Sequence, residues 1–458
     1  MCAKAKTNDE CEEFEREIAS DATFAFPRNI SERVVLGKHL IIAPEHANWL
    51  AYDDEEYGVF CLFRSGKSIQ EIGDALRGQG MNPDRAMTIV SQVVAQILGK
   101  EFEQKATATE KETLKVASLL LTAGCNLRCS ICRFKATVAG PNECSFDSWR
   151  RFLKAFANMG GETITLTGGE PMTSPNFNKI VTCAKDLGLR VVVLTNGTLV
   201  TKQNAKFLGK NCDEIQVSID GPNAETHDSV RGKGAFKKTI SALKELSVYS
   251  SCHLSIAMTP TLTTLPVFQV GLHRFAEKVW TDISPNISIR VSRTLVGGRK
   301  ISCLSDEEQE TYESKVIALC DDQLEVGFVD KLDSVAIVPN RRNVGCGVGE
   351  YFSIMADGEI KLCEFFPDSF GNIRNIGEDG NFLRTVAERV REIAHSFAVE
   401  ELSPCRQCDL RYFCGGKCRK DNKRYCGSPN VCKCDDVYKN SWYERLVRIS
   451  PYIVQPLT

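Results

Sequence analysis

The sequence lacks long apolar runs and carries almost no net charge. No apolar run approaches the roughly 18–20 residues that a membrane-spanning helix needs. The formal net charge of −2 gives no electrostatic reason to expect nucleic acid as a partner. The start, MCAKAKTNDECEEFEREI, has charges where a secretory signal needs its apolar stretch. These absences predict a cytoplasmic protein that acts neither in a membrane nor on nucleic acid.

What the sequence does have is cysteine, with 21 among 458 residues. In a secreted chain such a count would indicate disulfides. A long chain without an export signal is instead expected to meet reducing conditions, where clustered cysteines more often hold metal. The spacing within the clusters therefore decides which metal is expected.

The first part of the chain is predicted to be a small α/β domain. Residues 1–32 are charged and weakly patterned, and are predicted to form an N-terminal arm. Residues 33–102 have the pattern of a winged-helix-like domain, and residues 103–113 that of a polar linker. The predicted strands are 39–43 and 48–52, and the predicted helices are 55–63, 69–76 and 85–98.

Residues 114–300 alternate between apolar strands and amphipathic helices. This alternation predicts an α/β fold with a partial (β/α)6 barrel, whose strands all end at one rim. A bridging region (301–345), a cysteine-rich extension (346–445) and a tail (446–458) follow. The predicted strands are 116–121, 163–167, 191–194, 214–218, 253–258 and 287–291, and the helices include 148–159, 177–187, 203–208 and 236–246.

The first predicted barrel strand runs into a cysteine triplet: Cys125, Cys129 and Cys132, spaced C-x3-C-x2-C. Three thiolates, rather than four, leave a 4Fe–4S cluster with one open iron. That iron suits the amino and carboxylate groups of S-adenosylmethionine, whose reductive cleavage gives a deoxyadenosyl radical. A structural zinc site is the alternative, but zinc would normally need a fourth Cys or His at matching spacing.

Residues 114–300 resemble the core of the radical S-adenosylmethionine (radical SAM) superfamily, because further motifs follow the triplet in the family's order. Gly168-Gly169-Glu170-Pro171 is similar to the GGEP segment of that family. The resemblance implies that its backbone groups bind the amino group of the cofactor. Paired glycines at a strand end allow such a close approach, although alone they are also typical of a turn.

Other candidate cofactor residues follow the third and fourth strands. The resemblance implies that Ser218 contacts the ribose and that Arg231 binds the carboxylate, a usual guanidinium partner. An ordinary surface ion pair is the alternative for Arg231. Ile131 stands where the family often has an aromatic residue, so Phe134 is a candidate for the adenine contact. Asn196 and Asp220 complete the predicted cofactor-binding set.

The C-terminal cysteines resemble the SPASM extension of radical SAM enzymes. Cys346-x11-Gly358-x4-Cys363 is followed by C-x2-C-x5-C-x3-C and a late cysteine, over about 90 residues. The resemblance implies two auxiliary 4Fe–4S clusters, and hence three clusters in all. The first would have three cysteine ligands and an open iron, unless Cys426 or another cysteine fills it. The implied ligands are Cys346, Cys363 and Cys418 for the first, and Cys405, Cys408, Cys414 and Cys432 for the second, with Cys434 or Cys426 as alternatives to Cys432.

The front domain at 33–102 is not basic, which argues against DNA binding. It resembles the leader-recognition domain of peptide-modifying enzymes. The resemblance implies that the leader of a precursor peptide adds as a strand to an exposed sheet edge. A tethered leader would raise the effective concentration of the core peptide at the active site.

Together these features predict an oxidoreductase that matures ribosomally made peptides (RiPPs). The expected product is a Cys sulfur-to-carbon thioether, as in sactipeptides or ranthipeptides, and the expected reductant is a flavodoxin or ferredoxin. A carbon–carbon or carbon–oxygen crosslink is the alternative within the class. A sulfatase-maturing type of protein oxidase, or a non-enzymatic iron–sulfur or zinc module, are alternatives outside it.

Overall fold

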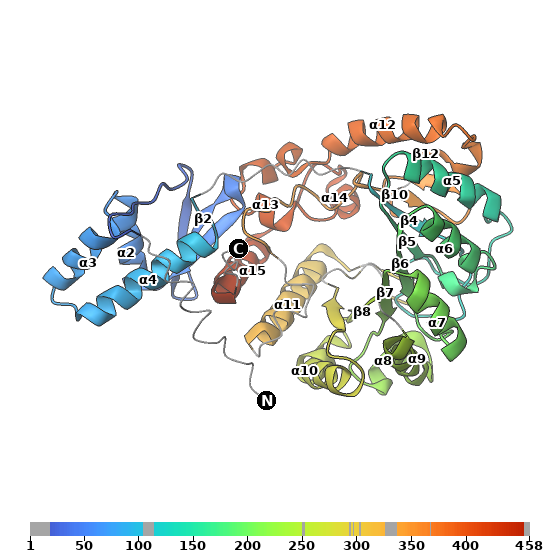
Figure 1. Ribbon diagram of the computed structural model, residues 1–458, viewed down its shortest axis with the longest axis horizontal. Helices are drawn as coiled ribbons and strands as arrows, with labels where there is room; N and C mark the ends of the chain where they lie inside the picture. Colours follow the sequence, from blue (N-terminus) through green and yellow to red (C-terminus); the bar gives the residue numbers. More distant parts are fainter. Residues whose placement is uncertain are drawn as a thin grey trace.

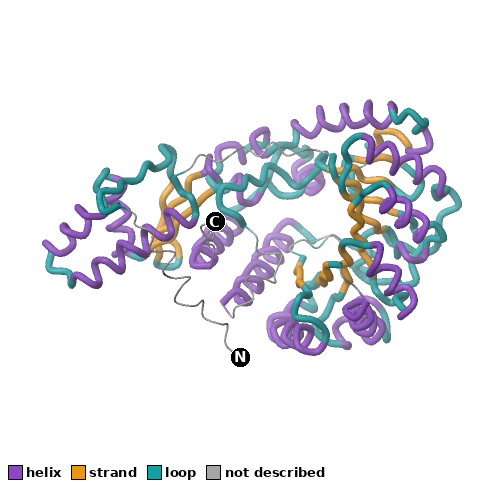
Figure 2. Tube along the Cα trace, viewed as in Figure 1, coloured by secondary structure: helices purple, strands orange, loops and turns teal. Residues whose placement is uncertain are grey.

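The computed structural model describes residues 19–103, 114–249, 252–292, 295, 297–301, 304–325, 337–366 and 368–452. The predictions for most of the arm, nearly all of the linker, part of the bridging region and the end of the tail lie outside these residues. Figure 1 shows a front domain at one end, a strand-and-helix barrel at the other, and some of the C-terminal helices between them. Figure 2 shows the two separate groups of strands.

The front domain contains one more strand than the sequence predicts. β1 (Ser31–Val35), β2 (Lys38–Ala43) and β3 (Asn48–Tyr52) form an antiparallel sheet in the order β1-β2-β3. β1 crosses the predicted boundary between residues 32 and 33, so the domain begins earlier than expected. Exposed and half-buried residues alternate along this edge strand and none is buried, which leaves it without the apolar pattern that identified β2 and β3.

Three helices pack on this sheet where the sequence predicts them. They are α2 (Asp54–Arg64), α3 (Ile69–Gly78) and α4 (Pro83–Gly99). Asp53 and Ser68 start α2 and α3 with reciprocal capping boxes, and Asn82 caps α4 directly before Pro83. The buried side chains of the helices and of β2 and β3 form a core of their own.

Six of the nine strands of the larger sheet form the barrel. The order is β12-β11-β10-β4-β5-β6-β7-β8-β9, and β4 to β9 run parallel. The helices cover the outer, convex side of the sheet (Figure 1). Bounds are β4 Val116–Leu120, β5 Thr163–Thr167, β6 Arg190–Thr195, β7 Glu214–Ser218, β8 His253–Met258, β9 Ser288–Val291, α5 Phe146–Asn158, α6 Phe177–Asp186, α7 Lys202–Asn211, α8 Ala224–Arg231, α9 Ala235–Tyr249 and α10 Leu265–Asp282.

A hairpin extends the barrel sheet where the sequence predicts one, from the turn residues Ala356-Asp357-Gly358-Glu359 between two apolar segments. β10 (Tyr351–Ile354) and β11 (Glu359–Lys361) are antiparallel, and β12 (Ser369–Asn372) follows β11. β10 pairs in parallel with β4, the first barrel strand.

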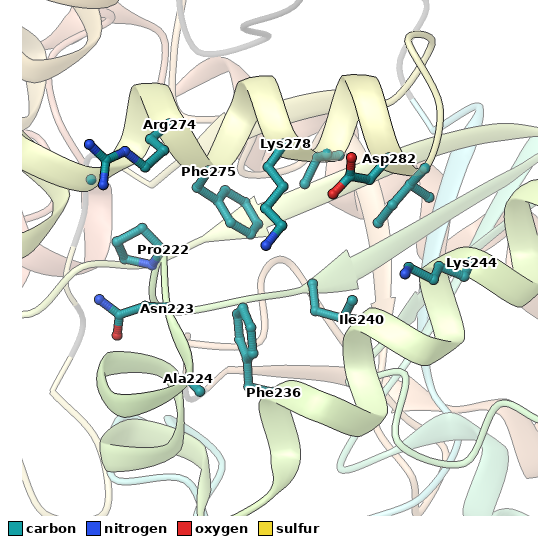
Figure 3. Close-up of a pocket in the computed structure, with 13 residues that line it drawn as sticks. Pro222, Asn223, Ala224, Phe236, Ile240, Lys244, Arg274, Phe275, Lys278 and Asp282 are labelled. Atoms are coloured by element: carbon teal, nitrogen blue, oxygen red, sulfur yellow. The ribbon is translucent and has the colours of Figure 1, made fainter.

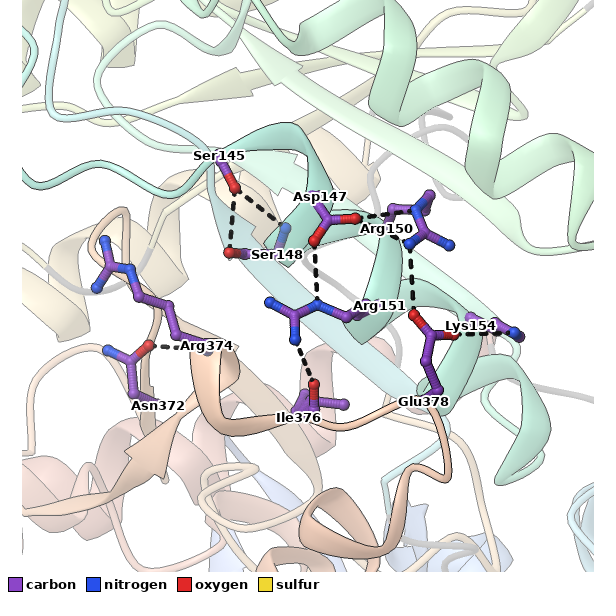
Figure 4. A network of polar contacts seen from close by, with 10 residues as sticks. All are labelled: Ser145, Asp147, Ser148, Arg150, Arg151, Lys154, Asn372, Arg374, Ile376 and Glu378. Atoms are coloured by element: carbon purple, nitrogen blue, oxygen red, sulfur yellow. Dashed lines mark hydrogen bonds and ion pairs between the residues drawn. The ribbon is translucent and has the colours of Figure 1, made fainter.

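Arg151 of α5 donates to the carbonyl of Ile376 at 2.9 Å, and Lys154 pairs with Glu378 at 3.2 Å, so α5 also holds the segment after β12 (Figure 4).

The remaining helices connect the barrel to the front domain. α15 (Asp436–Ile449) packs against α11 (Asp306–Glu325) and against all three strands of the front sheet. The indole N–H of Trp49 donates to the carbonyl of Leu446 at 2.8 Å. The predicted boundary between residues 445 and 446 is therefore wrong, because it falls inside α15. The other bounds are α12 Asn381–His395, α13 Arg411–Cys414 and α14 Arg419–Cys426.

None of the helices among the described residues is long and apolar enough to cross a bilayer.

Lys100 lies fully buried where the front domain meets the end of α15. Its ammonium nitrogen is 2.5 Å from the Oγ of Ser450, 3.3 Å from the carbonyl oxygen of Trp49 and 4.7 Å from the centre of the Trp49 ring. Burial lowers the pKa of Lys100 to about 7. In the unfolded chain the pKa of a lysine is about 10.4.

We therefore expect the folded state to gain stability from Lys100 as pH rises. Between pH 7 and about 10 the unfolded chain binds a proton that the folded protein does not, so the free energy of unfolding increases with pH. Urea unfolding of wild type and Lys100→Met at several pH values measures this effect. The difference in free energy of unfolding between wild type and Lys100→Met should change in favour of wild type as pH rises. Lys210→Met, at an exposed lysine of α7, should show no such change.

Candidate functional site

The loop after β4 carries the cysteine triplet and is fixed by backbone hydrogen bonds from several directions. The N–H of Cys125 donates to the carbonyl of Thr137 at 3.1 Å, and the N–H of Ser130 donates to that of Val230 at 2.8 Å. The N–H of Lys300 donates to the carbonyl of Ser130 at 2.9 Å. Segments from both ends of the barrel thus position the three thiols.

The glycines of the predicted GGEP segment lie directly against this loop. The N–H of Gly169 donates to the carbonyl of Thr122, and the N–H of Glu170 to that of Gly124, both at 2.8 Å. A Cβ at Gly169 would lie 2.0 Å from the oxygen of Gly124. At Gly168, whose φ is +137°, it would lie 2.5 Å from the oxygen of Thr122. Only glycine allows the two loops to approach this closely.

Glu170 joins the ends of β5 and β6 rather than facing open solvent. Its carboxylate accepts hydrogen bonds from the N–H of Asn196 at 2.8 Å and from the hydroxyl of Thr195 at 2.9 Å. Burial raises the pKa of Glu170, and these two donors oppose that rise. Pro171 then starts a short 3-10 turn, Pro171–Thr173. Glu170 therefore holds the glycine segment in place.

Asn196 connects the end of β6 to the cysteine loop. Its side-chain amide donates to the Oδ1 of Asn126 at 3.0 Å, and the amide of Asn126 donates to the hydroxyl of Thr198 at 2.8 Å. Asn126 follows Cys125 directly. Sequence reasoning did not identify Asn126, because a polar residue in a loop has no pattern of its own.

Asp220 and Arg231 form a buried ion pair beside the triplet. The Nε of Arg231 lies 2.6 Å from the Oδ2 of Asp220, whose Oδ1 accepts from the N–H of Thr259 at 3.0 Å. Asp220 is 1% exposed. With side chains 13% and 1% exposed, Arg231 and Asp220 do not form the ordinary surface ion pair that was the alternative. Ser218 is half-buried at the end of β7, which leads to Asp220.

The triplet thiols lie near one another and near Arg231. Burial raises the pKa of Cys125 and Cys129, while the guanidinium of Arg231 lowers both. Phe134 is half-buried, with its ring 4.8 Å from the guanidinium carbon of Arg133. The structure thus brings together the triplet, the glycine segment, Asp220 and Arg231 at one rim of the barrel.

The donor set fits an iron–sulfur cluster better than a single metal ion. Among the described residues, no three His, Cys, Asp or Glu side chains are arranged to hold one metal ion. In a 4Fe–4S cluster each thiolate binds a different iron, so the ligands need not converge on one point. Three neighbouring thiols on one loop meet that requirement, and the guanidinium of Arg231 lies beside them.

The C-terminal cysteines form two further groups. In the first C-terminal thiol group, Cys346 shares a hydrogen bond with Cys418, which lowers the pKa of Cys346 to about 6. Burial raises the pKa of Cys363, and the nearby Cys346 raises it further. The phenol of Tyr351 is hydrogen-bonded to Cys363. These three cysteines are the predicted ligands of the first auxiliary cluster.

The second C-terminal thiol group surrounds a cavity of about 480 Å³. Cys405 is hydrogen-bonded to Cys432, and Cys432 to Cys434. Ser31 and Arg33 of β1 also line this cavity. Five thiols are present where four were predicted, because both Cys432 and Cys434 belong to the group. Its cysteines are Cys405, Cys408, Cys414, Cys432 and Cys434.

Another cavity of about 480 Å³ lies on the outside of the barrel. Phe236 and Ile240 of α9 face Phe275 and Lys278 of α10 across it, as Figure 3 shows. It contains none of the predicted site residues. The chemistry-bearing residues therefore gather at the barrel rim and in the C-terminal part, not in this cavity.

Comparison with known proteins agrees with this site. Residues 119–264 match the Radical SAM superfamily, a segment that begins in β4 and includes the triplet, the glycine segment and Arg231. These residues form a radical SAM domain, which implies a 4Fe–4S cluster and S-adenosylmethionine as cofactors.

Two relatives differ in how much of the chain they match. The AdoMet-dependent heme synthase of Methanosarcina barkeri is 43% identical over 28% of this chain and only 37% of its own length. The antilisterial bacteriocin subtilosin biosynthesis protein AlbA of Bacillus subtilis is 28% identical over 73% of both chains. The chain thus spans little more than a third of the first relative.

Among solved structures, Streptococcus suis SuiB bound to S-adenosylmethionine has a similar fold. The TM-score is 0.53 at 16% identity, over 91% of this chain and 100% of SuiB. The similarity extends well beyond the radical SAM domain. It supports the predicted mixed α/β fold with a partial barrel.

We expect that replacing Gly169 with alanine weakens the rim. The added Cβ would meet the oxygen of Gly124, and forcing atoms into a packed site usually costs about 1–3 kcal/mol. Thermal unfolding should show a lower midpoint for Gly169→Ala. Gly58→Ala is the control, because a Cβ at this α2 position meets nothing within 4 Å; an equal midpoint in both variants would contradict the close approach.

Proposed function

We propose that this chain is a radical SAM maturase that forms a thioether crosslink in a ribosomally made precursor peptide. The observation that carries the proposal is that two further thiol groups accompany the radical SAM domain and its cysteine triplet. Radical formation alone would need only the triplet, so the two further thiol groups would have no role in it. Crosslinking, in contrast, needs a place for a substrate thiolate and for a surplus electron.

The cysteine triplet would hold the first 4Fe–4S cluster, and the two C-terminal thiol groups would hold the auxiliary clusters. S-adenosylmethionine bound at the first cluster supplies, after reduction, a deoxyadenosyl radical that can remove a hydrogen atom from carbon. Arg231, oriented by Asp220, would bind the cofactor carboxylate. The backbone at Gly168 and Gly169 would bind its amino group, and Phe134 would contribute to the adenine contact.

The first C-terminal thiol group would bind the substrate cysteine. It contains three cysteines, Cys346, Cys363 and Cys418, which would leave one iron free for a substrate thiolate. Closing a thioether breaks one C–H and one S–H bond and forms one C–S bond. The C–H hydrogen atom would leave with the deoxyadenosyl radical and the S–H hydrogen as a proton, so one electron must be accepted. A cluster held by the second C-terminal thiol group, with five cysteines available, would accept that electron.

Two observations favour a peptide as the substrate. The front domain offers a three-stranded sheet, and its edge strand β1 has exposed Val34 (67%) beside exposed Leu36 (53%). Sheet edges bind extended peptides through main-chain hydrogen bonds. In addition, the relative AlbA, matched over 73% of this chain, is named for bacteriocin biosynthesis. A flavodoxin or ferredoxin would supply the reducing electron in the cytoplasm.

We expect Cys125→Ala and Cys405→Ala to differ in their effects. Without Cys125 the first cluster loses one of three ligands, so formation of 5′-deoxyadenosine should cease. Without Cys405 the peptide crosslink should be lost while some 5′-deoxyadenosine still forms. Mass spectrometry measures both products, with Cys61→Ala at an exposed front-domain cysteine as the control. Normal crosslinking by Cys405→Ala would refute the electron-accepting role, and a carbon–carbon or carbon–oxygen product would refute the thioether.

We also expect the leader to act mainly through binding. A core peptide without its leader should be modified with a raised KM, because the tether no longer raises its effective concentration. Its kcat should change much less. Steady-state kinetics with full precursor and leaderless core measures this split. An unchanged KM would instead favour a protein oxidase of the sulfatase-maturing type.

A further inference from the structure

A cysteine, a charged residue and a phenylalanine follow one another at the end of the triplet, and again after the C-terminal hairpin. Cys132 is followed by Arg133 and Phe134, and Cys363 is followed by Glu364 and Phe365. The two segments are more than two hundred positions apart in the chain. In the folded protein they meet, although the sequence gives no signal that they should.

Arg133 is the centre of this contact. Its guanidinium forms an ion pair with the carboxylate of Glu364. The guanidinium carbon lies 4.8 Å from the centre of the Phe134 ring and 5.0 Å from that of Phe365. A planar guanidinium can bind a carboxylate through its edge while its faces contact aromatic rings. One side chain therefore connects both loops by two kinds of interaction.

Burial makes this pair different from the many exposed ion pairs of the protein. The side chain of Glu364 is 9% exposed and that of Arg133 is 39% exposed. A surface ion pair of two exposed side chains contributes little. A carboxylate that is almost removed from water depends on its partner, because breaking the pair leaves an uncompensated charge. The partner of Glu364 is Arg133.

The contact lies directly beside two groups of predicted cluster ligands. Arg133 is adjacent to Cys132, and Glu364 is adjacent to Cys363. The N–H of Lys135 donates to the carbonyl of Cys132 at 3.1 Å, and the N–H of Phe366 donates to that of Cys363 at 3.0 Å. Both ligand loops are therefore tight turns whose position follows that of the paired side chains.

We propose that Arg133 and Glu364 are positioning residues that set the distance between the radical-forming loop and the first C-terminal thiol group. This inference rests on the proposed function. A carbon radical formed at the first loop must meet a sulfur held at the second before it reacts otherwise. Orientation of reacting groups is effective only when it is held closely. The Arg133–Glu364 pair holds these two loops at a fixed distance from each other.

The test is the near-isosteric variant Glu364→Gln, together with the charge-swapped pair Arg133→Glu/Glu364→Arg. The anaerobic, cluster-loaded full chain is compared for 5′-deoxyadenosine formed per crosslinked peptide. Hydrogen–deuterium exchange of residues 125–137 in the same proteins gives a readout that does not depend on turnover. Arg190→Gln is the matched control, since Arg190 pairs with Glu214 at 2.9 Å at the other ends of the strands.

In Glu364→Gln we expect the ratio of 5′-deoxyadenosine to product to rise about tenfold, as for the loss of a charge-assisted contact. Exchange at 125–137 should also increase, while Arg190→Gln leaves both unchanged. The charge swap should restore most of the coupling. An unchanged ratio and exchange in Glu364→Gln would overturn the inference while leaving the proposed function intact. If wild type makes 5′-deoxyadenosine but no crosslink, the proposed function itself fails.

Discussion

The parallel pairing of β10 with β4 is the contact on which the arrangement of the sites depends. β4 is the first barrel strand and leads into the cysteine triplet, while β10 leads through its hairpin to Cys363. Because β4 also pairs with β5, it lies within the sheet and not at its edge. The hairpin that leads to Cys363 is thereby part of the barrel sheet, and it shares one support with the triplet.

The front domain is attached through polar contacts that reach the second C-terminal thiol group. Asp409, directly after Cys408, accepts hydrogen bonds from Ser31 at 2.8 Å and from Tyr443 at 2.7 Å, and pairs with Arg33 at 2.6 Å. Ser31 and Arg33 belong to β1, the edge strand. A peptide bound at the front sheet would therefore act on a strand that contacts a cysteine loop.

Local sequence patterns predicted the local structure well, and some of the site. The strands 163–167, 214–218 and 253–258 occur as predicted, because large apolar residues recur at every second position of each one and are buried. The cysteines of the triplet share one loop because they are close in sequence. Such features are encoded over a few residues each, whereas the grouping of Cys346, Cys363 and Cys418 came only from the resemblance to the SPASM extension.

Features that depend on distant partners were not predictable in this way. β1 was missed because an edge strand with one exposed face has a weak pattern. The hairpin was predicted, but its pairing with β4 was not, since either edge strand of the barrel, β4 or β9, could have accepted it. Arg133 and Glu364 were missed for the same reason. A charged residue beside a cysteine has no periodicity that identifies its partner more than two hundred positions away.

The polar residues at the rim show why such a site needs a rigid fold. Glu170, Asp220 and Arg231 are removed from water, which is costly unless every charge finds a partner. Each carboxylate accepts hydrogen bonds from the end of a neighbouring strand. The strand ends are thus tied to one another before any cofactor binds. A reactive carbon radical has many possible fates, so a site that fixes its geometry in advance selects one of them.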